Sequence, residues 1–115
     1  MPYLKLTTNA ESFKSKNAAL LNDLSLLLAK ETGKPERYVM VDLGFNPDML
    51  FGASGAALAY VECKSIGLTG QQAKALSAAI NRLLVTELEI AADRIYIEFS
   101  HCPAEFWGWN GSTFG

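Results

Sequence analysis

The proline at the second position is the residue of this chain with the most distinctive chemical potential. The sequence begins Met1-Pro2, and aminopeptidases generally remove a methionine that precedes a small residue, which leaves Pro2 with a free secondary amine. An ordinary α-amino group titrates at about 7.7–8.0. An apolar pocket or a neighbouring cation lowers that pKa because each disfavours the charged form. A neutral amine held near a substrate proton can act as a general base. Pro2 is therefore a candidate catalytic base, and an incidental second-position proline is the alternative.

Aromatic residues gather near the end of the chain. Trp107, Trp109 and Phe114 all stand within the last nine residues, among Gly and Asn. Such aromatic residues either line a pocket or pack against the sheet, and both interpretations remain open. His101 is the single histidine and the carboxylates are scattered, so no metal-ligand cluster is legible and we expect no metal site. Phosphate-loop, dinucleotide-binding and nucleophile-elbow motifs are absent.

Composition narrows the class of protein. The 115 residues fit one domain, 1–115, and the net charge of −2 argues against a nucleic-acid partner. No stretch reaches the roughly 18 apolar residues of a membrane span. The N-terminus lacks the pattern of a secretory signal, so we expect a cytoplasmic protein with no membrane partner. Cys63 and Cys102 do not form a C-x-x-C pair, and two reduced thiols are favoured over a disulfide framework.

The spacing of hydrophobic residues predicts the helices and strands that would position these residues. Leucines at helical spacing, Leu20, Leu21, Leu24, Leu27 and Leu28, indicate one face of a helix. A T-x-x-Q capping box at Thr69–Gln72 opens a second helix, which carries an apolar face of Leu76, Ile80, Leu83, Leu84 and Leu88. The pattern predicts, in order, a strand at 3–7, a helix at about 14–31, a strand at 38–45, a loop at 46–56, a strand at 57–66, the second helix, a strand at 94–99, and a tail at 103–115 with turns and a short strand.

The two halves of the chain look alike. In each, a helix leads to an acidic-Arg pair, Glu36-Arg37 or Asp93-Arg94, and then to a strand. Two β-α-β units predict an α+β fold of ferredoxin-like type, with a four-stranded sheet and both helices on one face. The other face of the sheet would lie bare, so we expect an oligomer to cover it.

Short segments along the whole chain resemble the macrophage migration inhibitory factor family of the tautomerase superfamily. They are the N-terminal M-P, the A-x-E-T-G-K-P-x-x-Y segment at 29–38, F-G at 51–52, S-I-G at 65–67, D-R-I-Y-I at 93–97 and G-W-N-G-S-T-F at 108–114. Each is weak alone, but they occur in order and at nearly the family's spacing.

This resemblance implies a homotrimer whose three sheets line a barrel, with an active site at the subunit interface around the N-terminal proline. It implies keto-enol tautomerisation of arylpyruvates such as phenylpyruvate, or of dopachrome derivatives, without a cofactor. Pro2 takes the role of base and then acid. Lys34 matches a lysine that grips the substrate carboxylate, and Tyr96 matches a tyrosine from a neighbouring subunit. The remaining expected pocket residues are Tyr38, Ser65, Ile66, Glu98, Trp107, Trp109 and Phe114.

Several positions depart from the family pattern. Leu58 and Val61 stand where the animal cytokine has its C-x-x-C motif, so a thiol-disulfide oxidoreductase role is not supported. Glu98 stands where the family often has Asn; it could raise the pKa of the proline, repel an acidic substrate or pair with Lys34. Tyr3 and Trp107 would narrow the pocket. A trimeric, cytokine-like signalling or binding protein with a vestigial pocket is the alternative function.

Overall fold

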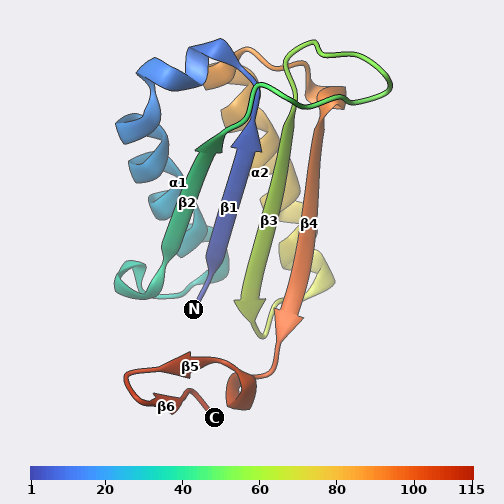
Figure 1. Cartoon of the computed structure of the whole chain (residues 1–115). Helices are drawn as coiled ribbons and strands as arrows, with labels where there is room; N and C mark the ends of the chain where they lie inside the picture. The colour runs from blue at the N-terminus through green and yellow to red at the C-terminus, as the bar shows by residue number, and fades with distance from the viewer.

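The computed structural model describes all 115 residues as two consecutive β-α-β units and a C-terminal hairpin (Figure 1). Its elements are β1 (Tyr3–Thr8), α1 (Asn17–Thr32), β2 (Met40–Phe45), β3 (Ala59–Ile66), α2 (Gly70–Leu88), β4 (Ile95–Cys102), β5 (Gly108–Trp109) and β6 (Ser112–Thr113). Short 3-10 turns precede α1, β2, β4 and β5.

The four long strands form one mixed sheet in the order β2-β1-β3-β4. β1 runs parallel to β2, β3 runs parallel to β4, and the two units join through the antiparallel pair β1 and β3. Both helices cover the same face of this sheet (Figure 1). The expected α+β class, with two β-α-β units, a four-stranded sheet and both helices on one face, is therefore confirmed. The ferredoxin-like detail differs, because the parallel strands of each unit are direct neighbours and no strand is inserted between them.

The core lies between the sheet and the helices. Alternate residues of the strands, such as Leu4 and Leu6 of β1 and Val61 and Cys63 of β3, are fully buried beneath the helices. The helices contribute a leucine-rich set at helical spacing: Leu20, Leu24 and Leu28 from α1, and Leu76, Ile80, Leu84 and Leu88 from α2. Leu21 was expected on this face but is exposed, because one residue turns a helix by about 100° away from Leu20.

The ends of several elements differ from the sequence-based expectation. A 3-10 turn, Glu36–Tyr38, replaces the first residues of the strand expected at 38–45. A matching turn, Ala92–Arg94, precedes β4, which continues to Cys102 instead of ending at 99. The predicted capping box is present, since Thr69 accepts from the backbone N–H of Gln72 and Gln72 reaches back to Thr69. The two turns confirm that the halves repeat the same local structure.

The second face of the sheet carries no helix. Its side chains come from the odd residues of β1 and the even residues of β3 and β4, including Lys5, Glu62 and Glu98. Tyr3 donates a hydrogen bond of 3.1 Å to Asp42 across this face. Neither helix combines the length and the apolar character needed to cross a membrane.

Candidate active site

One end of the sheet collects the start of β1, the turn before β2 and the C-terminal hairpin (Figure 1). A cavity of about 280 Å³ lies there. Its lining is mostly apolar and consists of Met1, Pro2, Tyr3, Arg37, Tyr38, Val39, Met40, Trp107, Gly108, Trp109 and Phe114. Five of the residues expected from the sequence, Pro2, Tyr38, Trp107, Trp109 and Phe114, therefore meet in one pocket.

The strand β1 fixes the position of Pro2. Pro2 is buried, and its carbonyl accepts a 3.0 Å hydrogen bond from the backbone N–H of Met40, which extends the pairing of β1 with β2. The amino group of Met1 donates to the carbonyl of Tyr38. The first two residues are thus held by the sheet, as a terminal catalytic group requires.

The electrostatic environment disfavours a charged amine at this end of the chain. The pKa of the Met1 amino group lies below its ordinary value, first because burial removes it from water and second because of the positive charge of Lys34. Lys34 directly follows Gly33, which ends α1 in the left-handed conformation with φ of 71°. This helix end therefore places a half-buried cation close enough to act on the amine.

Aromatic rings build one wall of the pocket. Trp109 and Phe114 stack with ring centroids 5.5 Å apart, and both meet the edge or face of Tyr38, at 5.3 Å and 5.7 Å. The hairpin that carries Trp109 turns at Asn110-Gly111, where both residues have positive φ. The backbone N–H of Phe114 donates 3.1 Å to the carbonyl of Trp107, which closes this tail on itself.

Three expected residues, Lys34, Ser65 and Ile66, lie near this end of the sheet but outside the cavity lining. Ser65 is fully buried near the end of β3, and Ile66 is half-buried beside it. The register pairs Tyr3 with Lys64, so Ser65 follows directly and lies across from Pro2. The backbone of β3 therefore reaches the neighbourhood of the pocket without forming its wall within one chain.

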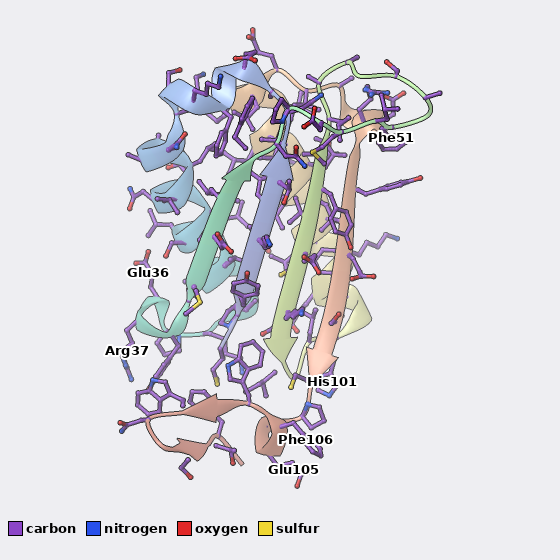
Figure 2. The ribbon with its side chains drawn as sticks, in the orientation of Figure 1. Glu36, Arg37, Phe51, His101, Glu105 and Phe106 are labelled. Carbon is purple, nitrogen blue, oxygen red and sulfur yellow. The ribbon has the colours of Figure 1, made fainter.

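Tyr96 and Glu98 lie away from the pocket in a single chain. Tyr96 is the second residue of β4, at the opposite end of the sheet, where its ring lies 4.5 Å, centroid to centroid, from that of Phe51. Phe51 lies at the top of Figure 2, far from Arg37. Its register partner on β3, Tyr60, is aligned with Thr7 of β1. Five residues of strand, about 16 Å, separate Thr7 from Pro2. Glu98 is exposed and lies next to Tyr60, whose pKa is raised first by burial and then by the charges of Glu98 and Glu62.

Arg37 is a pocket residue that we did not predict from the sequence. The turn Glu36–Tyr38 places its guanidinium 4.8 Å from the centre of the Tyr38 ring, at the edge of the cavity. Its neighbour Glu36 turns toward α1 and accepts a 2.8 Å hydrogen bond from Ser25. The signal available in the sequence was its position next to Tyr38 in the G-K-P-x-x-Y segment.

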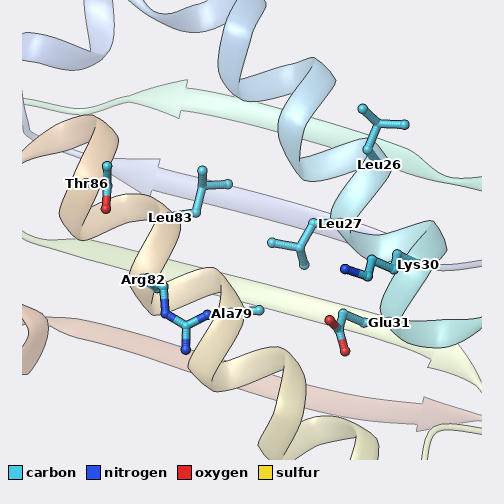
Figure 3. A pocket seen from close by; sticks show the side chains of 8 residues that line it. All are labelled: Leu26, Leu27, Lys30, Glu31, Ala79, Arg82, Leu83 and Thr86. Carbon is cyan, nitrogen blue, oxygen red and sulfur yellow. The ribbon is translucent and has the colours of Figure 1, made fainter.

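A larger cavity, about 450 Å³, lies between α1 and α2 on the side away from the sheet (Figure 3). Leu26, Lys30, Glu31 and Arg82 are among its lining residues, and none of the expected site residues reaches it. It is a shallow surface groove without converging catalytic groups, so size alone does not mark the active site.

The other potentially reactive side chains, Cys63 and His101, lie outside the pocket. Cys63 is buried in the core, and burial raises the pKa of its thiol to about 11, which leaves it protonated and unreactive at neutral pH. His101 is exposed and its Nδ1 accepts a 3.1 Å hydrogen bond from the backbone N–H of Gly67. No group of three or more His, Cys, Asp or Glu side chains is placed to hold a metal ion.

Comparison with known proteins gives the same family throughout. The macrophage migration inhibitory factor (MIF) family model matches residues 1–115. A macrophage migration inhibitory factor homolog of Brugia malayi is 39% identical, with 100% of each chain covered, and the Xenopus tropicalis macrophage migration inhibitory factor is 38% identical over 99% of each. A crystal structure of a homologue from Prochlorococcus marinus superposes with a TM-score of 0.90 at 41% identity, covering 98% of this chain and 99% of that one. The chain therefore belongs to the macrophage migration inhibitory factor family, within the tautomerase superfamily.

Proposed function

We propose that this protein is a cofactor-independent keto-enol tautomerase of arylpyruvates or related 2-oxo acids, with Pro2 as the base once Met1 has been removed. The observation that carries the proposal is the pocket at the start of β1. It combines a buried proline, an amino terminus with a lowered pKa and a wall of three aromatic rings. The family membership supports isomerase chemistry in general.

The proposed reaction moves one proton between carbon and oxygen. The neutral Pro2 amine takes a proton from the carbon next to the keto group, and the electron pair of the broken C–H bond forms the enolate. The charge of Lys34 stabilises the negative oxygen and the substrate carboxylate. The protonated amine then gives its proton to the enolate oxygen, which returns the base to its neutral form. The aryl ring lies against Tyr38, Trp109 and Phe114.

We propose further that the working form is a homotrimer. Tyr96 is 63% exposed and Leu50 is 73% exposed at one end of the sheet, while Met40 and Phe106 are 64% and 75% exposed near the other. Apolar side chains at two different sites on the chain suit a head-to-tail contact that closes into a ring. Such a contact would bring Tyr96 and Glu98 of one subunit to the pocket of the next, which a single chain cannot do.

A binding or signalling role without catalysis is the second candidate, because the relatives bear the name of a migration inhibitory factor. The test that separates the two roles is the ultraviolet assay of phenylpyruvate enol-keto exchange. It compares the Met1-free protein with Pro2→Gly, and with Pro47→Gly in the exposed loop after β2 as the matched control.

We expect Pro2→Gly to lose the exchange activity and Pro47→Gly to keep it. Mass spectrometry of each protein establishes whether Met1 is absent, and light scattering establishes whether the trimer is present. If the Met1-free trimer shows no activity on phenylpyruvate or dopachrome-type substrates, the tautomerase proposal is wrong and the binding role is favoured. A monomer in solution would contradict the assembly.

A further inference from the structure

Arg37 has no acceptor for its guanidinium N–H groups within the chain. No hydrogen bond or ion pair engages it, although the side chain lies at the cavity edge over the ring of Tyr38. Arg94, in the corresponding turn before β4, donates to four backbone carbonyls at 3.0–3.1 Å, those of Phe51, Ser54, Ala56 and Ala57. The two arginines occupy similar turns, but Arg94 is fully hydrogen-bonded and Arg37 has no hydrogen-bond partner.

The pocket also lacks any negative charge of its own. None of its 11 lining residues is Asp or Glu, in a chain whose net charge is −2. The carboxylate next to Arg37 in the sequence, Glu36, turns away and bonds to Ser25 (Figure 2). The one carboxylate that the proposed trimer would add is Glu98 of the neighbouring subunit. A guanidinium with free donors, at the edge of a cavity whose own lining holds no carboxylate, is suited to hold an anionic group of a ligand.

The position of Arg37 indicates which part of the ligand it would meet. Lys34 lies outside the cavity lining and follows the end of α1, near the terminal amine whose pKa its charge lowers. Arg37 instead stacks on Tyr38, the ring that contacts both Trp109 and Phe114. In the reaction proposed above, the keto-acid end lies at the amine and the aryl ring lies on this aromatic wall, so a substituent on the ring would lie near Arg37.

We propose that Arg37 is a specificity-determining residue that binds a second anionic group on the ring of the substrate. The preferred substrates are then aryl 2-oxo acids with two negative charges, a carboxylate beside the keto group and another on the ring. The planar guanidinium holds the ring carboxylate through paired hydrogen bonds while it stays stacked on Tyr38. This inference rests on the proposed tautomerase function and adds a substrate class to it.

The test compares kcat/KM for phenylpyruvate and for 4-carboxyphenylpyruvate in the wild type, Arg37→Gln and Arg37→Lys. In the wild type we expect the dianion to be the better substrate. Arg37→Gln lowers the ratio of the two kcat/KM values by about fivefold, the upper end for an exposed ion pair, and added salt lowers the wild-type ratio in the same direction. Arg37→Lys gives an intermediate ratio, because it keeps the charge but loses the planar fork.

Arg82→Gln is the matched control, because it removes the same charge from α2, where the side chain lines only the groove of Figure 3. It is expected to leave the ratio unchanged. An Arg37→Gln protein that loses equal activity on both substrates, or on neither, overturns the proposal. If the wild type turns over neither substrate, the proposed function fails by itself. Calorimetric affinities of both compounds for the wild type and Arg37→Gln then decide the role of Arg37, and an unchanged affinity ratio overturns it.

Discussion

The two β-α-β halves share their local structure but differ in what their polar groups contact. In the second half, α2 begins with the Thr69 capping box, Arg94 holds the long loop, and Ile90 follows the helix end as a buried core residue. In the first half, α1 begins without a side-chain cap, Arg37 has no partner, and Lys34 follows the helix end beside the pocket. The turn whose arginine has no partner is the one that lies at the pocket, while the turn of Arg94 supports a loop at the other end of the sheet. The two copies of the repeat therefore use the same residue type differently.

The largest expected difference is between the two arginines. Arg94→Ala removes four hydrogen bonds to carbonyls of the loop between β2 and β3, which then lose a charged donor. We expect the free energy of unfolding to fall by about 2–3 kcal/mol. Arg37→Ala should change it by less than about 0.5 kcal/mol, as for other exposed residues. Urea denaturation of both variants measures the difference, and equal losses would contradict the division between the halves.

The helix starts give the next largest difference. Thr69→Ala removes the hydroxyl that accepts from the N–H of Gln72 at 3.1 Å, and we expect a loss of about 1 kcal/mol. Lys16, at the same position before α1, makes no side-chain cap, so Lys16→Ala should cost little beyond its 3.8 Å contact with Glu87. Thermal unfolding of the two variants ranks them. A Lys16→Ala loss as large as that of Thr69→Ala would be inconsistent with this account.

The helix ends differ in the residue that takes the left-handed conformation. Gly33 ends α1 with φ of 71°, and Glu89 ends α2 with φ of 56°. A residue with a Cβ pays a steric cost in this region. Gly33→Ala should therefore lower the free energy of unfolding by about 1 kcal/mol, and Glu89→Gly should raise it by a smaller amount, about 0.5 kcal/mol. Chemical denaturation provides the measurement, and stabilisation by Gly33→Ala would contradict the cap assignment.

The smallest effect on stability, and the most specific one on chemistry, is expected for Lys34→Gln. The pKa of the Met1 amino group lies below its ordinary value, first because of burial and second because of the charge of Lys34. Once Met1 is removed, we expect the same two causes to act on the Pro2 amine. A base must be neutral to act, so kcat/KM should rise with pH through the amine pKa. Removing Lys34 moves that rise to higher pH, because only burial still lowers the pKa. A pH–rate profile of the Met1-free proteins tests this shift, and an unchanged or lower midpoint would contradict it.

Much of the fold was predictable because it rests on local patterns. The period of the leucines, the T-x-x-Q box and the Gly33 helix end are readable within a few residues, and each is present in the structure. The 3-10 turn at Glu36–Tyr38 was not predicted, since the Tyr38-Val39-Met40 segment has the composition of a strand and only pairing with β1 decides where β2 begins. The exposure of Leu21 was missed because the direction of one helix face depends on where the sheet lies.

The sequence by itself determined the β-α-β repeat and the residue types of the candidate site, because periodicity, caps and turn residues act over short distances. Only the tertiary structure decided which of those residues meet. It brings Pro2 to Tyr38 and to a hairpin a hundred residues later, adds Arg37 to the same cavity, and places Tyr96 at the far end of the sheet. Such contacts follow from strand order and register, which the pairing of distant segments sets and no local pattern specifies.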